Sequence, residues 1–253
     1  MSETVALSEF KPADYKTDLK PVWCAGCGDF GALTALYRAL TLAAGVKVSR
    51  PDLKVIAVGG DGDGLAIGGN HFMHAARRNL DVAYFMMDNE IYGLTKGQTA
   101  PTTPAGDKTK STHYGNPEPS IDPCELAISV GATWVARAFS GDLKGTVELM
   151  VKALSHRGFA FLNVMSPCVT WRGDDQFKTL KAKQRALPAD HDPTSRPAAL
   201  VYTRETEVVT TGVLYEIVQP SYLDRLDAIK KVALAGKPAP TVADIIKTFE
   251  PSF

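Results

Sequence analysis

Several classes of protein are excluded by what this sequence lacks. Its 253 residues carry no excess charge, since Lys+Arg and Asp+Glu number 28 each, so nothing favours a nucleic acid or an anionic membrane as a partner. No apolar run approaches the ~20 residues that span a bilayer. Residues 1–20 are polar, without the apolar stretch of a signal peptide. We therefore expect a cytoplasmic protein that binds neither membrane nor nucleic acid.

Cysteine is also scarce, with four residues in the whole chain. This number does not suggest a secreted disulfide scaffold. In a reducing compartment, the pair Cys24 and Cys27 in a Cys-x-x-Cys motif is more often metal-binding or redox-active. A thioredoxin-like pair and half of a zinc site remain alternatives. Zinc sites usually bring a second short-spaced pair, whereas Cys124 and Cys168 are isolated.

Short apolar runs alternate with helical patterns along most of the chain. We predict buried strands at 54–58, 82–87, 133–138 and 160–165, and helices at 66–78, from Pro123, and at 146–154. Strands that alternate with helices predict an α/β fold, a parallel sheet flanked by helices. We expect one domain over residues 1–175. Residues 176–253 are more polar, and we expect an irregular C-terminal extension that packs on the core or a partner, with a strand at 211–217 and a helix from Tyr222.

A long segment without a helical or strand pattern extends from Gly93 to Asn116 and is rich in glycine, proline and threonine. Loops of this length are uncommon in compact domains unless they have a function. We therefore expect this loop to serve the site.

Polar residues follow two of the predicted strands. Gly60-Asp61-Gly62 follows the first, and Asp88-Asn89 follows the second. In a parallel sheet these two loops lie on the same edge, where ligands bind. Oxygen ligands from Asp61 and Asn89 suit Mg²⁺ holding a diphosphate, and the glycines let the backbone approach phosphates. A lone Gly-Asp-Gly is usually a tight turn, but the second polar pair strengthens the functional interpretation.

Four motifs together resemble the beta subunit of the 2-oxoacid:ferredoxin oxidoreductases, with the 2-oxoglutarate branch nearest. They are Trp-Cys-x-Gly-Cys-Gly-Asp-Phe-Gly at 23–31, Gly-Gly-Asp-Gly-Asp-Gly-Leu-Ala-Ile-Gly-Gly-Asn-His at 59–71, Asp-Asn-Glu-Ile-Tyr-Gly-Leu-Thr-Lys-Gly-Gln at 88–98, and Ser-Pro-Cys at 166–168. The similarity covers nearly the whole chain, and the combination of motifs is highly specific.

The resemblance implies that this chain supplies the diphosphate-binding half of a thiamine diphosphate site. The implied cofactor-binding residues are Gly60, Asp61, Gly62, Asp63, Asn89, Ile91, Gly93, Leu94 and Thr95. Among them Asp61, Asn89 and the backbone carbonyl of Ile91 would bind Mg²⁺. Lys96 would pair with the distal carboxylate of a dicarboxylic 2-oxo acid, although a lysine in a loop is generally solvated.

The resemblance also implies partners. An alpha subunit would supply the pyrimidine half of the site, including the activating glutamate, so no catalytic residue is expected in this chain. The pair would form a heterodimer or a dimer of heterodimers. Electrons would pass through a [4Fe-4S] cluster to ferredoxin, and coenzyme A would take the acyl group of the 2-oxo acid.

The cluster ligands are incomplete in this sequence. A [4Fe-4S] cluster usually takes four thiolates, and the resemblance supplies Cys24, Cys27 and Cys168. The family's remaining ligand lies in a Gly-Ile-Gly-Cys segment that is absent here, where the chain passes from Leu40 through Ala43-Ala44-Gly45 to Val46. Three explanations compete: a segment of the protein missing from this sequence, which we favour, a true deletion with a compromised cluster, or ligation by Cys124, which we do not favour.

Two other functions remain possible on the sequence. A non-redox thiamine-diphosphate-dependent decarboxylase subunit would contain no iron and would release an aldehyde. A non-catalytic assembly subunit would bind no thiamine diphosphate, and the intact Gly62, Asp61 and Asn89 argue against it.

Overall fold

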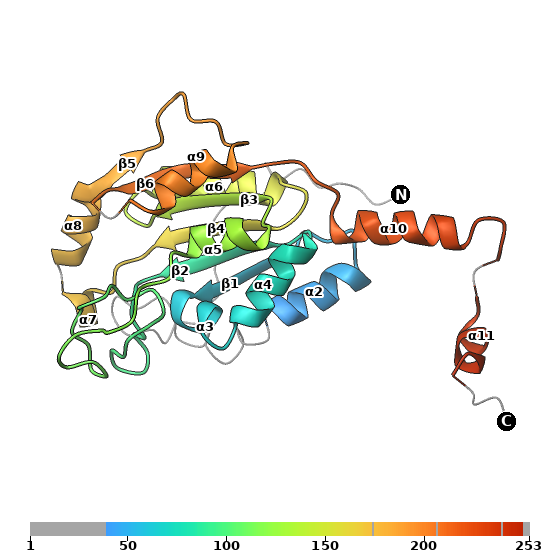
Figure 1. The fold of residues 1–253 in the computed structure, drawn as a ribbon, viewed down its shortest axis with the longest axis horizontal. Helices are drawn as coiled ribbons and strands as arrows, with labels where there is room; N and C mark the ends of the chain where they lie inside the picture. Colours follow the sequence, from blue (N-terminus) through green and yellow to red (C-terminus); the bar gives the residue numbers. More distant parts are fainter. Residues whose placement is uncertain (1–38, 174, 206, 239, 250–253) are drawn as a thin grey trace, which may run out of the picture.

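The computed structural model describes residues 39–173, 175–205, 207–238 and 240–249 (Figure 1). Its helices are α2 Ala39–Ser49, α3 Asp61–Leu65, α4 Gly69–Arg78, α5 Pro123–Val130, α6 Leu143–Ser155, α7 Val169–Arg172, α8 Asp175–Lys183, α9 Arg196–Thr203, α10 Tyr222–Ala233 and α11 Val242–Lys247. Its strands are β1 Ile56–Gly60, β2 Ala83–Asp88, β3 Trp134–Phe139, β4 Ala160–Met165, β5 Gln184–Ala186 and β6 Val209–Glu216.

The six strands form one sheet in the order β1-β2-β4-β3-β6-β5. The first four in this order are mutually parallel, as the alternation of strands and helices predicts. Strand β6 runs antiparallel to β3, and β5 pairs parallel with β6. In the register of β1 with β2, Gly60 lies opposite Met87. The residues that follow these two strands therefore begin side by side.

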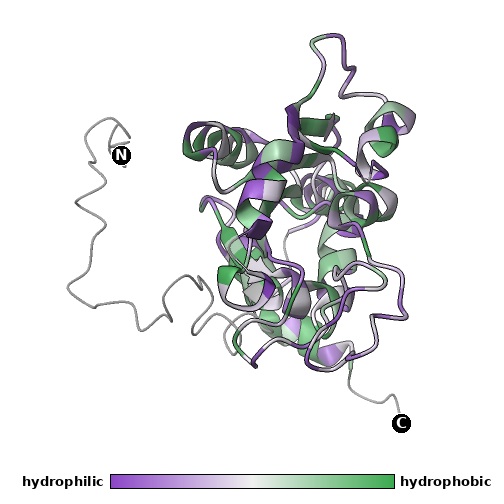
Figure 2. Cartoon of the chain, turned by 90° about the vertical axis from the view of Figure 1, so that its left-hand side faces the viewer, coloured by the Kyte–Doolittle hydropathy of each residue, from purple (hydrophilic) through white to green (hydrophobic). Residues whose placement is uncertain are grey.

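Helices cover both faces of the sheet. On one face, a core of buried side chains that includes Phe72, Ile128 and Phe161 lies beneath α2, α4, α5 and α9. On the other face, a second core that includes Trp134 and Leu162 lies beneath α6. Figure 2 shows hydrophilic and hydrophobic residues mixed along the helices, as expected for helices with one buried side.

The predicted strands agree with the structure to within two residues, because buried parallel strands are continuous apolar runs. The predicted helix at 66–78 was wrong at its start. Residues 61–65 form the separate helix α3, and α4 begins at Gly69. The turn between them folds tightly, since the N–H of Gly68 donates to the carbonyl of Asp63 at 2.7 Å.

The C-terminal part is more regular than we expected. Strand β6 belongs to the main sheet, where it pairs with β3 on the side away from β4. Helices α10 and α11 have no buried residues and extend away from the sheet, at the opposite end from α3 and α7 (Figure 1). Within the described part of the chain, no helix combines the length and apolar character that a membrane span needs.

Asn79 connects this extension to the body. It ends α4 in the left-handed conformation, with φ 52°. Its side-chain oxygen accepts hydrogen bonds from the hydroxyl of Thr133 and the N–H of Phe159, both at 2.8 Å. Its side-chain nitrogen donates to the carbonyl of Pro220 at 3.2 Å. The base of α10 is therefore held by the same buried residue that joins α4 to β3 and β4.

Candidate cofactor site

The predicted diphosphate and metal residues gather at the carboxyl ends of β1 and β2. Asp61 is the first residue of α3, directly after β1, and Asn89 directly follows β2. The backbone N–H of Asn89 donates to Oδ1 of Asp61 at 3.3 Å. The two residues that the sequence places on a common edge are thus in direct contact.

Asp61 is a buried carboxylate, 1% exposed. Its Oδ2 accepts a short hydrogen bond from the hydroxyl of Thr102, which lies in the long loop. Burial and then the negative charge of Asp88 raise the pKa of Asp61 well above its usual range. The groups that oppose this shift are hydroxyl and backbone donors. A cation bound here would relieve the cost of burying the charge.

Asp88 is the last residue of β2, and its side chain bonds to the neighbouring strand β4. Its Oδ2 accepts a hydrogen bond from the side-chain nitrogen of Asn163 at 3.0 Å, whereas its Oδ1 has no hydrogen-bond partner. Burial raises the pKa of Asp88 to about 6. Asp88 therefore increases the negative potential at Asp61, although its own side chain bonds Asn163 on β4.

Asn89 shapes the chain that follows β2. Its Oδ1 accepts a hydrogen bond from the N–H of Ile91 at 3.0 Å. Between them, Glu90 has a left-handed backbone with φ 59°. Its pKa is raised to about 7, first by burial and then by Asp88. The local turn thus holds Asn89 against Asp61 and Ile91 against Asn89.

These donors fit Mg²⁺ by their chemistry. A carboxylate, an amide oxygen and a backbone carbonyl are hard oxygen ligands, and Mg²⁺ is usually held by one or two carboxylates together with substrate phosphates. Among the residues that the structure describes, no group of three or more His, Cys, Asp or Glu side chains could hold a metal ion. The proposed set of Asp61, Asn89 and Ile91 contains one carboxylate, so it would hold the metal together with the oxygens of the diphosphate rather than through a cluster of charged side chains.

The glycine loop is closely packed. A Cβ atom at Gly62 would lie 2.5 Å from the ring of Tyr92, whose hydroxyl donates to the Gly62 carbonyl at 2.8 Å. Asp63 directs Oδ1 to the N–H of Gly60 at 2.9 Å. Gly60 and Gly62 therefore lie next to Asp61. This carboxylate oxygen of Asp63 instead caps the N-terminus of α3.

The segment that contains Gly93, Leu94, Thr95 and Lys96 forms a tight turn. It is closed by a hydrogen bond from the N–H of Gly97 to the carbonyl of Tyr92 at 2.8 Å. The Thr95 hydroxyl donates to Gln98 Oε1 at 2.6 Å. Lys96 is exposed and has a left-handed backbone, with φ 83°. Its side chain is therefore at the surface of the turn that follows the metal residues.

Two of the four cysteines, Cys124 and Cys168, lie among the described residues. Cys24 and Cys27 lie outside the described residues. Cys168 follows β4, is 3% exposed and precedes α7, so it lies on the same sheet edge as the cofactor residues. Cys124 is completely buried in α5, and its thiol donates to the carbonyl of Ala136 at 3.8 Å. Burial raises the pKa of the Cys124 thiol, which disfavours a thiolate ligand there.

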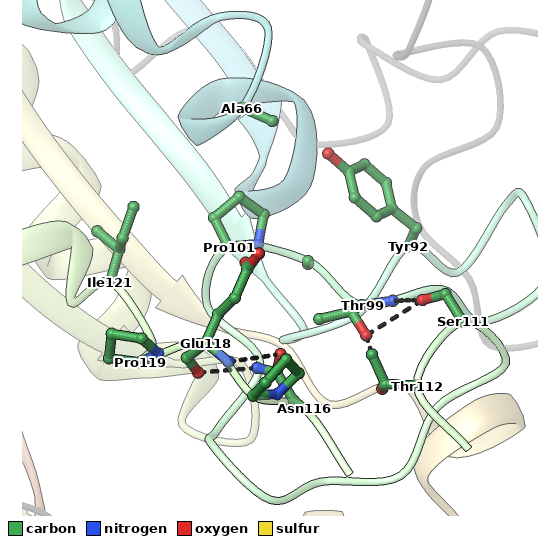
Figure 3. A pocket seen from close by; sticks show the side chains of 12 residues that line it. Ala66, Tyr92, Thr99, Pro101, Ser111, Thr112, Asn116, Glu118, Pro119 and Ile121 are labelled. Atoms are coloured by element: carbon green, nitrogen blue, oxygen red, sulfur yellow. Dashed lines mark hydrogen bonds between the residues drawn. The ribbon is translucent and has the colours of Figure 1, made fainter. Parts of the chain in front are cut away.

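A cavity of about 410 Å³ lies next to the Tyr92 side of this site (Figure 3). The residues that line it come from the end of α3 and from the long loop, and include Ala66, Tyr92, Thr99 and Glu118. Hydroxyl groups of Thr99, Ser111 and Thr112 are hydrogen-bonded to one another on one wall. The loop that we expected to have a function therefore shapes the rim of the site and supplies Thr102 within it.

The sequence did not identify Thr102 or Tyr92 as site residues. The only signal was their position: Thr102 belongs to a Pro-Thr-Thr-Pro stretch of the long loop, and Tyr92 follows the metal motif directly. Their partners, Asp61 and Gly62, are distant in sequence, so periodicity could not connect them.

Comparison with known proteins first defines the class. The model of the thiamine pyrophosphate enzyme C-terminal TPP-binding domain matches residues 22–164, which include every polar residue of the Asp61–Asn89 edge. The chain thus contains a thiamine-diphosphate-binding α/β domain. A second model, the C-terminal part of the pyruvate ferredoxin oxidoreductase beta subunit, matches residues 168–231.

Relatives then define the family. The beta subunit of 2-oxoacid:ferredoxin oxidoreductase 2 from Aeropyrum pernix is 32% identical, covering 92% of this chain and 96% of that protein. The 2-oxoglutarate synthase subunit KorB from Archaeoglobus fulgidus is 37% identical over 70% of this chain and 77% of its own length. The chain belongs to the beta subunits of the 2-oxoacid:ferredoxin oxidoreductases.

A solved structure agrees with this assignment. The 2-oxoglutarate:ferredoxin oxidoreductase of Magnetococcus marinus, with 2-oxoglutarate, coenzyme A and succinyl-CoA bound, is 35% identical and superposes with a TM-score of 0.84, covering 96% of this chain and 97% of that chain. The alignment with the Aeropyrum protein is 297 positions long although this chain has 253 residues. That relative therefore contains positions that this chain lacks.

Proposed function

We propose that this chain is the beta subunit of a 2-oxoglutarate:ferredoxin oxidoreductase that forms or cleaves an acyl-coenzyme A and is active only with its alpha subunit. The observation that carries the proposal is the contact between Asp61 and Asn89 at the edge of a sheet whose next parallel strand, β4, ends near Cys168. The proposed diphosphate site and the proposed cluster ligand Cys168 thus lie at the same edge of the sheet.

In this proposal the chain's residues bind and orient the cofactor. Oxygen atoms of Asp61, Asn89 and Ile91 would hold Mg²⁺, and the backbone of Gly60, Gly62 and the 93–95 turn would approach the diphosphate. When bound, thiamine diphosphate supplies the carbon nucleophile that adds to the 2-oxo carbon and allows carbon dioxide to leave. The protein itself supplies the position, the negative site for the metal, and exclusion of water by burial of Asp61.

Lys96 would recognise the substrate's second carboxylate. Its side chain is exposed on the turn that begins at Gly93, so it can reach a ligand that lies over the cofactor without breaking a packed contact. An ammonium near a carboxylate in a partly desolvated site gains electrostatic stabilisation that a solvated lysine lacks. A dicarboxylic 2-oxo acid would therefore be preferred to pyruvate.

Cys24, Cys27 and Cys168 would ligate a [4Fe-4S] cluster that passes electrons to ferredoxin. The fourth ligand would come from a segment of the protein that is missing from this sequence, and not from Cys124, since its thiol is buried and hydrogen-bonded within the α5–β3 core. We further propose a heterodimer or a dimer of heterodimers, with residues 1–175 as the cofactor domain and residues 176–253 packing on the core or the partner. Iron and sulfide analysis, with the absorbance near 400 nm that bleaches on reduction, tests the cluster.

The test of function is an assay of the chain co-purified with its alpha subunit. We expect viologen reduction with 2-oxoglutarate that requires coenzyme A and thiamine diphosphate, and weaker reduction with pyruvate or branched 2-oxo acids. Release of an aldehyde without viologen reduction and without iron would instead identify a non-redox decarboxylase. No binding of thiamine diphosphate in the presence of Mg²⁺ would identify a non-catalytic assembly subunit.

A further inference from the structure

The turn that carries the predicted cofactor residues contains two strained positions. Glu90 has φ 59° and Lys96 has φ 83°, and neither is a glycine. Non-glycine residues adopt this left-handed conformation only where surrounding contacts hold it. The turn between them, residues 90–97, therefore needs an external support to keep its shape when no cofactor is present.

Trp171, on the short helix α7 after Cys168, supplies the first support. Its indole N–H donates to the carbonyl of Gly93 at 2.8 Å. Its ring lies against Gly97, where an added Cβ atom would be 3.0 Å from the ring. The ammonium of Lys110, from the long loop, lies 5.6 Å from the centre of the same ring. One side chain thus contacts the middle of the turn at Gly93, its end at Gly97, and the loop beside it.

Arg172, the next residue, supplies the second support. Its guanidinium forms ion pairs with Glu90 at 3.0 Å and with Asp107 at 2.7 Å. The side chain of Arg172 is 16% exposed and that of Glu90 is 20% exposed, so this ion pair is largely shielded from solvent, whereas the side chain of Asp107 is 38% exposed. Glu90 is one of the two strained residues, and Arg172 fixes it from outside the turn.

A third contact links the same turn to the cysteine. The side chain of Gln176 accepts a hydrogen bond from the backbone N–H of Cys168 at 3.1 Å and donates to Glu90 at 3.4 Å. Residues that follow Cys168 therefore make three polar contacts with two residues of the cofactor turn: Trp171 bonds Gly93, and Arg172 and Gln176 both contact Glu90.

We propose that Trp171 and Arg172 are positioning residues that hold the 90–97 turn in its cofactor-binding conformation and so link the Cys168 segment to the diphosphate site. The inference rests on the proposed function, because it concerns the same cofactor. Neither residue belongs to the ligands proposed for Mg²⁺, and both act through the turn. In their absence the turn would relax at Glu90 and Lys96, and cofactor binding would have to restore it.

The experiment uses the complex with the alpha subunit and compares Trp171→Phe, Arg172→Gln and the control Arg204→Lys. Trp171→Phe keeps a smaller aromatic ring beside Gly97 and removes the hydrogen bond to Gly93. Arg204 pairs with Glu125 on the surface, at 2.6 Å, away from the site. Affinity for thiamine diphosphate with Mg²⁺ is measured by isothermal titration, and the melting temperature is measured without cofactor.

We expect affinity to fall about 10–100-fold in Arg172→Gln, as for residues that orient metal ligands from behind. Loss of one hydrogen bond in Trp171→Phe should cost about 2–10-fold. The Arg204→Lys complex should match wild type. At saturating cofactor, kcat should recover to within about twofold of wild type, because the bound cofactor then imposes the conformation of the turn.

Three outcomes separate the possibilities. Cofactor affinity within twofold of wild type in both site variants overturns the positioning role, even if activity falls. A lower melting temperature with a kcat that saturating cofactor does not restore shows that the residues support only the fold, and also overturns it. Failure of the wild-type complex itself to bind thiamine diphosphate refutes the proposed function instead, so the two failures are distinguishable.

Discussion

Replacing Asp61 by asparagine should stabilise the cofactor-free protein while it abolishes Mg²⁺ binding. Asparagine has the same shape, so Oδ1 can still accept from the N–H of Asn89, and the side-chain nitrogen can donate to the hydroxyl oxygen of Thr102. Every hydrogen bond of the carboxylate therefore has a replacement. What disappears is a negative charge that is 99% buried and is repelled by a second carboxylate, Asp88.

The size of the effect follows from the cost of a buried charge. The groups that favour ionised Asp61 are a hydroxyl and backbone N–H groups, none of which is a full positive charge. Replacing poorly compensated buried charges by well-packed neutral groups stabilises proteins by about 1–3 kcal/mol. For a chain of this size each kcal/mol raises the melting temperature by about 2–4 °C. We therefore expect a melting temperature about 3–10 °C higher for Asp61→Asn in EDTA at pH 8.

The pH dependence supplies an internal check. The pKa of Asp61 is higher in the folded protein than in the unfolded chain, so ionisation destabilises the fold as the pH rises from the ordinary value through the folded value. The advantage of Asp61→Asn should be greatest at pH 8 and should vanish near the ordinary carboxyl pKa of about 3.9. Thermal unfolding of both proteins from pH 4 to 8 measures it. A variant that is no more stable at pH 8, or an advantage that does not shrink on acidification, would contradict the reasoning.

Other perturbations test separate features. Lys96→Gly should raise KM for 2-oxoglutarate about tenfold or more in the assembled enzyme, because it removes the ammonium group. Glycine also adopts the positive φ of this position without strain, so the backbone should keep its conformation. An unchanged KM refutes the substrate role. Gly62→Ala should destabilise the protein by about 1–3 kcal/mol in urea unfolding, because its Cβ would meet the ring of Tyr92. The matched change Gly69→Ala, which has open space around it, should be neutral or stabilising. Asn79→Ala should cost about 2–4 kcal/mol in the same measurement, since it leaves buried donors and an acceptor unpaired; a loss below 1 kcal/mol would contradict the role assigned to it.

The regular part of the fold could be predicted because its physical cause is local. Buried parallel strands are uninterrupted apolar runs, and the four that form the parallel part of the sheet were found to within two residues. The meeting of Asp61 and Asn89 was also predictable, because parallel strands place their carboxyl ends on one edge. That conclusion needed only the order of the elements.

Helix α3 illustrates why the rest could not be predicted. Two of its five residues are glycine, and helix propensity alone argues against a helix at Asp61–Leu65. All five residues are buried, so tertiary contacts hold this turn rather than local preference. The same applies to Thr102, Trp171 and Arg172, whose partners lie in other loops and are separated from them by tens of residues. Loop conformation decides these contacts, and no periodicity in the sequence encodes it.

The distribution of unsatisfied polar atoms points to the same edge of the sheet. Among the described residues, three buried side-chain atoms lack a hydrogen-bond partner, and two of them are Oδ1 of Asp88 and Oδ1 of Asn163. A fold selected for stability alone would replace such a pair, since each unpaired buried group costs about 1–3 kcal/mol. Asp88 also raises the pKa of Asp61, another group whose charge is poorly compensated. The two apolar cores on either face of the sheet allow the fold to tolerate these destabilising groups at one edge.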